Sequence, residues 1–266
     1  MENEAFELAA TLLRKADYIT ALTGAGISTP SGIPDFRSPT SGIWEKYDPA
    51  EVASLHGFRR DPRKFYDWIR PLIRTLVEAQ PNAAHTALAR MEATGKLKSV
   101  STQNIDMLHT AAGSQTVYEL HGHLREMTCI HCFAVYPAQP FIENFLAAED
   151  DEMNYSDQQD ESADPLANLP RCPNCNHVLK PNVILYGEQL PINKLVAARN
   201  EASECDLMIV AGSSLEVFPA AELPMIARRK NAGLIIVDLR PTAMDWLASV
   251  VLRGNVVDIL PRLADV

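Results

Sequence analysis

Short, almost continuously apolar runs punctuate the sequence, and they limit the folds open to this chain more than any other feature. Such runs are typical of strands covered on both faces, as in a parallel sheet between layers of helices. Helical apolar spacing alternates with them, beginning within residues 4–16. We therefore predict an α/β fold. The predicted strands are 18–23, 97–102, 116–120, 183–186, 206–212 and 233–238, with 256–260 as a candidate for the last one.

The first apolar run leads into a glycine-rich loop, residues 24–37. Without side chains at Gly24 and Gly26, a ligand such as a pyrophosphate can approach the backbone amides. A bare Gly-x-Gly is equally compatible with a tight turn that binds nothing. Pro30 and Pro34 exclude a regular helix after the second glycine, so the loop does not fit the usual dehydrogenase fingerprint.

Polar residues follow the predicted strands directly, which indicates a binding crevice. Residues 35–37 bring a carboxylate, an aromatic ring and a guanidinium into the first loop, and loops are where binding residues concentrate. Asn104 and Asp106 follow the second strand, and His121 follows the third. Ligands of doubly wound sheets bind outside the carboxyl ends of the strands, so these side chains are expected to converge. A histidine alone is more often structural, but this placement favours a functional role for His121.

Four of the five cysteines form two Cys-x-x-Cys pairs, Cys129-Ile-His-Cys132 and Cys172-Pro-Asn-Cys175. Four thiolates complete a tetrahedral zinc shell and leave no position for water, so we predict a structural zinc site. Reduced cysteines without metal are the less favoured alternative. His131 and His177 are competing ligands that rank below the four cysteines.

An acidic stretch lies between the two cysteine pairs. Residues 143–164 contain nine acidic side chains and no lysine or arginine. This composition predicts a solvated, mobile loop. The zinc segment as a whole is predicted to be an insertion into the α/β domain.

Composition excludes several classes of protein. The chain has 266 residues, 47% of them hydrophobic, which suffices for a buried core. Its net charge of −10 disfavours nonspecific binding to nucleic acid and makes a basic peptide the more natural partner. The N-terminus has no basic region and the chain has no apolar span near 20 residues, so we expect no membrane association and a cytoplasmic location.

Taken together, these motifs resemble those of the sirtuin family, and the resemblance runs from about residue 5 to the C-terminus. It rests on Gly24-Ala-Gly-Ile-Ser, Ser31-Gly-Ile-Pro-Asp-Phe-Arg37, Thr102-Gln-Asn-Ile-Asp106, His121-Gly122, the four cysteines, Tyr186-Gly-Glu188 and Gly212-Ser-Ser-Leu-Glu-Val217. The resemblance implies a Rossmann-like NAD-binding domain with a doubly wound parallel sheet, formed by residues 1–35, 81–123 and 180–266. It also implies a smaller module of helices and a four-cysteine zinc ribbon, formed by 36–80 and 124–179, with the acidic insertion at 143–164. A substrate peptide is expected in the cleft between them.

The activity that the resemblance implies is NAD-consuming deacylation of lysine in proteins, which yields nicotinamide, free lysine and O-acyl-ADP-ribose. The implied catalytic residues are His121, as the general base, Asn104 and Asp106. The implied cofactor contacts are Gly24, Ala25, Gly26, Ser28, Asp35, Phe36, Arg37, Gln103, Asn104, Asp106, Gly212, Ser213, Ser214 and Asp238. The implied substrate contacts are Val183, Tyr186, Gly187, Glu188, Glu216 and Val217, where a peptide would bind by strand addition. The protein is expected to be a monomer with one structural zinc ion.

This chain departs from the family pattern at two places, and from the pattern of its succinyl-preferring members at a third. Asp238 stands where asparagine is common and should favour NAD over NADP, although Arg240 lies nearby. Tyr186 replaces a frequent phenylalanine. Sirtuins that prefer succinyl-lysine resemble one another in a Tyr-x-x-Arg pair, whereas here Tyr66 is followed three residues later by Ile69, and the arginine is displaced to position 70. We therefore expect neutral acyl groups to be preferred over succinyl.

Two alternatives remain at this stage. The same cofactor site would serve protein mono-ADP-ribosyl transfer, which differs in its products. A binding module regulated by NAD is less favoured, because His121, Asn104 and Asp106 are all present.

Overall fold

The computed structural model describes residues 2–36, 42–152 and 168–266. The chain forms two compact units. Unit 1 comprises Met1–Glu45, Ala79–His121 and Leu190–Val266, and unit 2 comprises Lys46–Glu78 and Gly122–Gln189. Residues 180–189 thus belong to unit 2, whereas the sequence placed them in the larger domain.

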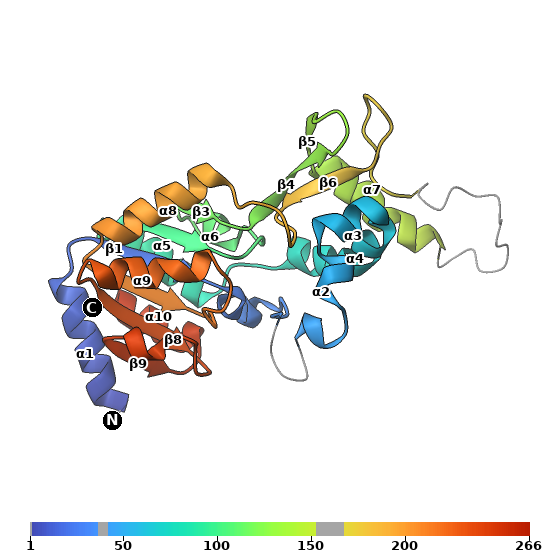
Figure 1. Ribbon diagram of the computed structural model, residues 1–266. Helices are drawn as coiled ribbons and strands as arrows, with labels where there is room; N and C mark the ends of the chain where they lie inside the picture. The colour runs from blue at the N-terminus through green and yellow to red at the C-terminus, as the bar shows by residue number, and fades with distance from the viewer. Residues whose placement is uncertain (1, 37–41, 153–167) are drawn as a thin grey trace. The chain divides into compact units, whose positions relative to one another are not determined.

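Unit 1 is built on a six-stranded sheet in which every neighbouring pair is parallel (Figure 1). Its order is β3-β2-β1-β7-β8-β9, so the direction in which strands are added reverses between β1 and β7. This is the doubly wound order that the sequence predicted, with the crevice for a ligand at the reversal point. The strands are β1 (Ile19–Thr23), β2 (Leu97–Thr102), β3 (Val117–Glu119), β7 (Leu207–Ala211), β8 (Gly233–Asp238) and β9 (Val250–Arg253).

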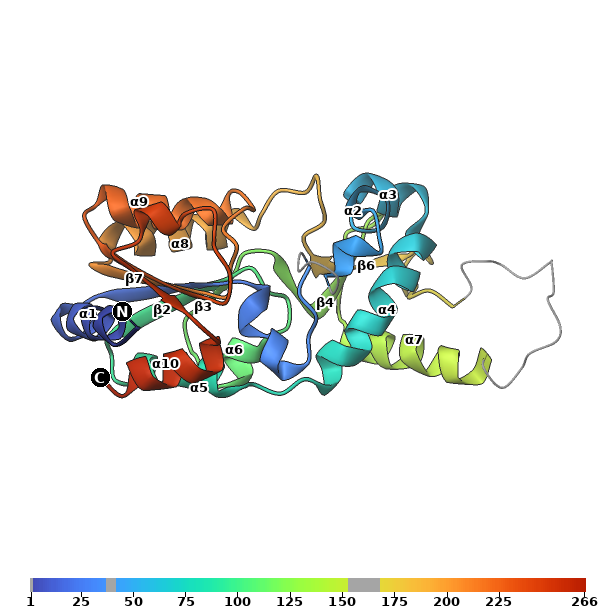
Figure 2. The same ribbon diagram turned by 90° about the horizontal axis from the view of Figure 1, so that it is seen from below.

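Helices cover both faces of this sheet (Figure 2). One buried cluster joins the sheet to α1 (Glu2–Lys15), α5 (Ala83–Ala93) and α10 (Val256–Ala264). A second cluster, on the other face, joins it to α8 (Ile192–Glu204) and α9 (Leu223–Arg229). All five residues of β1 and of β7 are buried, which explains why these strands read as continuous apolar runs. The short α6 (Leu108–Ala111) follows β2.

The expected strand at 256–260 is wrong, because these residues form α10. Asn255 caps the helix through a bond from Val257 N to its side chain, and Val256, Ile259, Leu260 and Leu263 are buried at helical spacing. The last strand is β9, directly before this helix. Valine-rich sequence misled the prediction, since the cap and the burial pattern outweigh β-branched propensity here.

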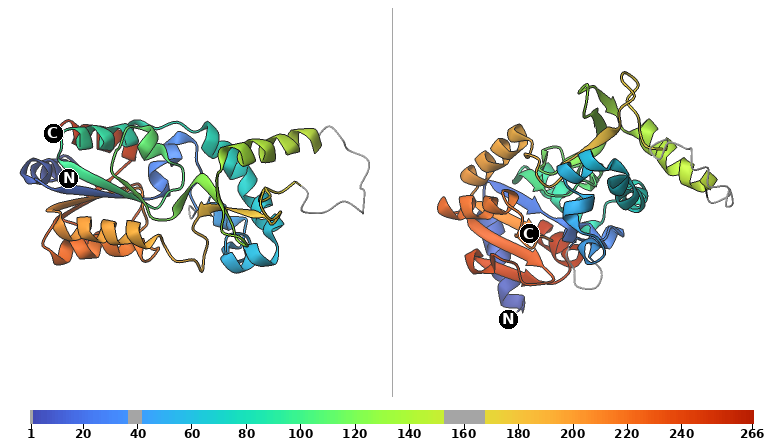
Figure 3. Two further views of the ribbon diagram at one scale, coloured as in Figure 1. Left: turned by 90° about the horizontal axis from the view of Figure 1, so that it is seen from above. Right: turned by 45° about the vertical axis from the view of Figure 1, so that its right-hand side comes forward.

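Unit 2 combines a small antiparallel sheet with helices. The sheet has the order β5-β4-β6, with β4 (Gly122–Cys129), β5 (Val135–Pro137) and β6 (Leu179–Val183). The prediction that residues 183–186 form a strand of the large sheet is therefore wrong. The helices are α2 (Pro49–Val52), α3 (Leu55–Arg60), α4 (Pro62–Glu78) and α7 (Gln139–Glu152), and α4 packs beside α7 (Figure 3).

The predicted acidic loop at 143–164 is wrong for its first part, because α7 extends to Glu152. Ile142 and Phe145 are buried one helical turn apart, and the Phe145 ring meets Tyr66 of α4 edge-on at 5.1 Å. Apolar anchoring thus overrides the acidic composition at the start of this stretch. Residues 153–164 lie outside the described residues. In the part of the chain that the structure describes, no helix is long and apolar enough to cross a membrane.

Candidate active site and metal centre

The loops that follow β1 and β7 touch through their backbones at the point where the strand order reverses. Gly26 N donates to Gly212 O at 2.9 Å, and a Cβ atom on Gly24 would lie 2.8 Å from the same oxygen. Gly212 itself has φ 62°, and a Cβ there would lie 2.2 Å from Ile27 N. Close packing of the two loops therefore requires these glycines, which differs from the direct approach of a ligand that the sequence suggested.

Three side chains that the sequence singled out form one buried hydrogen-bond network. Asn104 Nδ2 donates to Gly24 O at 3.1 Å and to Ser28 Oγ at 3.0 Å. Ser28 Oγ donates to Asp106 Oδ2 at 2.6 Å, and Asp106 Oδ1 accepts from Leu108 N. The network fixes the glycine loop to the segment after β2, and both Asn104 and Asp106 are buried.

Two buried histidines, His85 and His109, lie next to this network, and the sequence analysis missed both of them. Asn82 N donates to His85 Nδ1, so the neutral ring carries its proton on Nε2, which faces Ser28 Oγ at 3.4 Å. Burial lowers the pKa of His85 to about 4, although Asp106 opposes the shift, and burial lowers the pKa of His109 to about 3. Both rings are therefore neutral near pH 7. The Asn82-x-x-His85 spacing at the start of α5, a capping box, was the signal that could have revealed His85.

His121 follows β3 and is tied to the end of β2. Its Nδ1 lies 2.9 Å from Gln103 O, and a carbonyl oxygen only accepts, so Nδ1 is the protonated nitrogen of the neutral ring. The basic lone pair then belongs to Nε2. Gln103 Nε2 in turn donates to Ser213 Oγ at 2.9 Å, which connects the β2 loop to the β7 loop.

The loop after β7 is ordered by its own serines. Ser213 Oγ accepts from Leu215 N at 3.3 Å, and Ser214 Oγ donates to Glu216 Oε2 at 3.1 Å. Ser213 is buried, whereas Glu216 is exposed and precedes Val217. The structure therefore presents Glu216 at the end of a loop whose start packs on the glycine loop.

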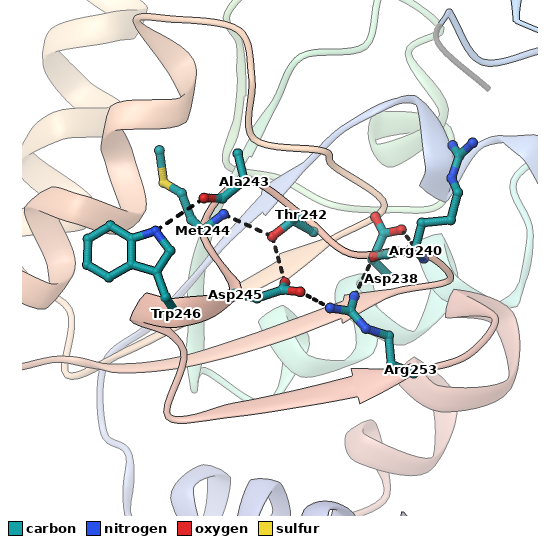
Figure 4. A network of polar contacts seen from close by, with 8 residues as sticks. All are labelled: Asp238, Arg240, Thr242, Ala243, Met244, Asp245, Trp246 and Arg253. Carbon is teal, nitrogen blue, oxygen red and sulfur yellow. Dashed lines mark hydrogen bonds and ion pairs between the residues drawn. The ribbon is translucent and has the colours of Figure 1, made fainter. Parts of the chain in front are cut away.

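A polar network surrounds the end of β8 (Figure 4). Asp238 Oδ1 accepts from Arg240 N at 2.9 Å, and burial raises the pKa of the Asp238 carboxyl despite the two opposing arginines, Arg240 and Arg253. Arg240 Nη2 pairs with Asp35 Oδ2 at 3.2 Å, which links this network to the loop after β1. Arg253 also pairs with Asp245 and donates to Arg240 O.

The remaining residues of the glycine loop are placed as follows. Ala25 begins the short 3-10 turn η1 (Ala25–Ile27), and the Phe36 ring lies 5.2 Å from that of Trp44. Arg37 lies outside the described residues. Within unit 1, hydrogen bonds thus connect Gly24, Ser28, Asn104 and Asp106 in one network. Separate bonds connect Gly26 with Gly212, and Gln103 with His121 and Ser213.

In unit 2, a buried lysine organises the segment after β6 that the sequence assigned to substrate. Lys180 Nζ donates to Pro181 O and Val183 O and pairs with Glu188 Oε2 at 3.1 Å. Glu188 Oε2 also accepts from Leu185 N. Gly187 takes φ 87°, and the Tyr186 side chain is exposed. Lys180, which the sequence analysis did not single out, therefore holds the shape of residues 183–188.

The four predicted cysteines come together in unit 2. Cys129 Sγ lies 3.5 Å from Cys175 Sγ, Cys132 Sγ lies 3.5 Å from Cys172 Sγ, and all four sulfur atoms lie within 4.8 Å of one another. Zinc–sulfur bonds of about 2.3 Å in a tetrahedron separate neighbouring sulfurs by about 3.8 Å. The cluster therefore fits one structural zinc ion.

The two cysteine pairs have the same local geometry. Phe133 N donates to Cys129 O and Asn176 N donates to Cys172 O, and each of these residues after the second cysteine has φ 60°. Each turn therefore presents two sulfur atoms on one side. Fold and site together define a Rossmann-type nucleotide-binding protein that carries a four-cysteine metal module.

Comparison with known proteins gives the family. The Sir2 family model matches residues 24–219, and the chain belongs to this family. It is 42% identical over 266 residues to the NAD-dependent protein deacylase 2 of Archaeoglobus fulgidus, covering 100% of this chain and 96% of that protein. A Sir2 variant solved with a deacetylated p53 peptide and 3'-O-acetyl-ADP-ribose matches with TM-score 0.84 at 39% identity, covering 96% of each chain. Sir2Af2 bound to a myristoylated histone peptide matches with TM-score 0.79 at 36% identity, covering 100% of this chain and 96% of that one.

Proposed function

We infer that this protein is an NAD-dependent protein lysine deacylase that removes acetyl and other neutral acyl groups. The observation that carries the inference is the Sir2 family match over residues 24–219, together with 42% identity to a deacylase along the whole chain. The buried network of Asn104, Ser28 and Asp106, and the contact of His121 with Gln103, supply ordered polar groups for such a site. NAD is consumed as a co-substrate, and one zinc ion serves the structure of unit 2.

The proposed reaction cleaves the amide bond of acyl-lysine and the bond between nicotinamide and ribose in NAD. One water molecule is consumed as the acyl group passes to a hydroxyl of ADP-ribose and the lysine amine takes up a proton, so the products are nicotinamide, free lysine and O-acyl-ADP-ribose. His121 is the proposed general base, because Nδ1 is held by Gln103 O and Nε2 keeps the lone pair that takes a proton from a ribose hydroxyl. Asn104 and Asp106 are proposed to orient ribose and the nicotinamide carboxamide.

The cofactor is proposed to lie along the carboxyl ends of β1, β2, β7 and β8. The reversal of strand order between β1 and β7 supports a dinucleotide at this position, with Gly24, Gly26 and Gly212 in the loops that border it. Asp238 is proposed to accept the adenosine ribose hydroxyls, which favours NAD over NADP because the carboxylate repels a 2'-phosphate. The Arg240 guanidinium is paired with the Asp35 carboxylate, so this cation is less available to bind a 2'-phosphate. The other proposed cofactor contacts are Ala25, Ser28, Asp35, Phe36, Arg37, Gln103, Ser213 and Ser214.

The proposed substrates are acyl-lysine segments of proteins, bound in extended form. The backbone of residues 183–188, held by Lys180, and the loop at Glu216 and Val217 are the proposed peptide-binding segments. A net charge of −10 supports lysine-rich peptide partners rather than nucleic acid. We further propose that the protein acts as a monomer in the cytoplasm.

The first test identifies the products. We expect incubation with NAD and an acetyl-lysine peptide to give nicotinamide, deacetylated peptide and O-acetyl-ADP-ribose in equal amounts, measured by mass spectrometry. An unacetylated peptide of the same sequence is the matched control and should release little nicotinamide. A peptide that gains ADP-ribose and keeps its acetyl group would show mono-ADP-ribosyl transfer instead.

A second prediction concerns the acyl group. The Tyr66 hydroxyl already donates to Leu179 O at 2.6 Å, and the Arg70 guanidinium packs 4.0 Å above the Phe145 ring. A carboxylate buried without a cation costs several kcal/mol. We therefore expect kcat/KM for an acetyl peptide to exceed that for the succinyl form by at least about 100-fold.

The variant Ile69→Arg places a cation three residues after Tyr66 and should raise desuccinylation. Ile69→Met is the matched control, because it changes shape without adding charge. Ile69 is buried, so the unfolding midpoints of both variants must be measured beside kcat/KM. A preference of the unmodified enzyme for succinyl-lysine would contradict the interpretation.

A further inference from the structure

Two exposed histidines flank the four-cysteine centre. His131 lies between the cysteines of the first pair, and His177 lies two residues after Cys175. Their rings are stacked, with centroids 3.8 Å apart and planes at 4°. The structural zinc ion needs neither ring, because four thiolates already complete its shell.

The backbone fixes the orientation of His177. Its Nδ1 lies 3.0 Å from Cys175 O, and because a carbonyl only accepts, Nδ1 is the donor and Nε2 carries the lone pair. The same arrangement orients histidines that bind metals. Asn176 in the left-handed region and the bond from Cys172 N to His177 O hold this turn in place.

The histidines and one cysteine offer donors for a second ion. A ring nitrogen of His131, a ring nitrogen of His177 and Cys175 Sγ all lie within 4.8 Å of one another. Bonds of about 2.1 Å to nitrogen and 2.3 Å to sulfur require donors about 3.4 to 3.6 Å apart with converging lone pairs. The exposed His131 ring must therefore turn out of its stack on the His177 ring, whose orientation the backbone holds. Imidazole and thiolate are ligands that suit zinc.

Charge favours a cation at this place. A zinc ion with four thiolates carries a net charge of −2, so a second divalent cation beside it is attracted. The Cys175 thiolate keeps lone pairs with which it can bridge two ions. Arg171, whose Nη1 donates to Asn176 O, opposes the second cation and should make its binding weaker than that of the first.

We propose that His131, His177 and the bridging Cys175 thiolate form an outer zinc site beside the structural centre. The three protein donors leave one tetrahedral position for water, and both rings are exposed, so zinc at this site exchanges readily with solution. The outer site thereby provides a route by which zinc reaches or leaves the four-cysteine centre.

The test is a zinc titration of the full-length protein with its structural site loaded, against a chromophoric chelator, followed by metal analysis. We expect the wild type to bind a second equivalent of zinc, more weakly than the first. His131→Ala and His177→Ala should each weaken the second step by more than about 10-fold and leave the first equivalent bound. His56→Ala, which changes an exposed histidine of α3, is the matched control and should bind both equivalents like the wild type.

Titration with cobalt provides a second measurement, because a cobalt ion bound by nitrogen and sulfur absorbs differently from one bound by four sulfurs. The spectrum of cobalt bound by nitrogen and sulfur should appear in the wild type and in His56→Ala, but not in His131→Ala or His177→Ala. Retention of the first equivalent shows that a variant remains folded. Saturation of the wild type at one equivalent, or a second equivalent unchanged in both histidine variants, would overturn the outer site.

Discussion

Replacement of His121 by alanine is expected to lower kcat/KM for deacylation by about 100- to 10,000-fold, the usual contribution of a positioned general base. NAD binding should persist, because the Asn104, Ser28 and Asp106 network that shapes the cofactor loop does not include the His121 side chain. Product formation and NAD affinity, the latter by calorimetry, are the two measurements.

His121→Asn separates the chemistry from the position of this side chain. An asparagine amide can still donate to Gln103 O but cannot accept a proton, so this variant should be as inactive as the alanine variant. Recovery of activity in His121→Asn would show that the residue positions Gln103 and does not act as the base. Loss of NAD binding in both variants would place His121 in the cofactor site instead.

Replacement of Cys172 by alanine is expected to release the structural zinc ion and unfold unit 2. Cys172 is buried, and its sulfur lies 3.5 Å from Cys132 Sγ, so alanine removes one of the four thiolate ligands from the interior of the module. Binding of structural zinc contributes about 10 kcal/mol or more to the folding of small zinc domains, so the loss should exceed that of an ordinary core substitution. Metal content, thermal unfolding and deacylation are measured together.

Cys205→Ala is the matched control for this experiment. Cys205 is also buried, but it lies in unit 1 and its sulfur contacts Ala202 O rather than the cluster. The control should keep its zinc ion and most of its activity. A Cys172→Ala protein that is free of zinc and fully active would refute a structural role for the metal.

The sequence predicted the features that depend on spacing and on special residues. Two Cys-x-x-Cys pairs indicated the metal centre because each pair places two thiolates on one turn, and the cysteines lie together in the structure. Apolar runs such as β7 predicted the parallel sheet because both of its faces are covered. Pro30 and Pro34 predicted that no regular helix follows the glycine loop, and only short 3-10 turns occur at residues 25–31.

The failures arose where long-range packing outweighs local composition. The acidic residues after position 143 favoured a loop, although α7 is anchored there through Phe145. The valines at the start of α10 favoured a strand, although these residues are buried with helical spacing. Residues 179–183 joined the small sheet because β4 offers an antiparallel partner that no local pattern reveals.

The polar groups behind the site were also hidden from sequence reasoning. Gly212 O accepts a hydrogen bond from Gly26 N, and these two glycines lie in loops that are far apart in the sequence. The same holds for His85, whose ring reaches Ser28 only after α5 packs against the loop that follows β1. The capping-box spacing of Asn82 and His85 places His85 at the start of α5, but it does not tell which residue of a distant loop the ring will contact.

The central position of β1 sets an order of events during synthesis. β1 pairs with β2 on one side and with β7 on the other, where Ile19 lies opposite Leu207. As the chain leaves the ribosome, unit 2 is complete at Gln189, before β7 has emerged. Until then one edge of β1 has no partner, and an unpaired apolar edge is a template for aggregation. The nascent chain therefore keeps this edge of β1 open until β7 emerges, which is after all residues of the metal module have been made.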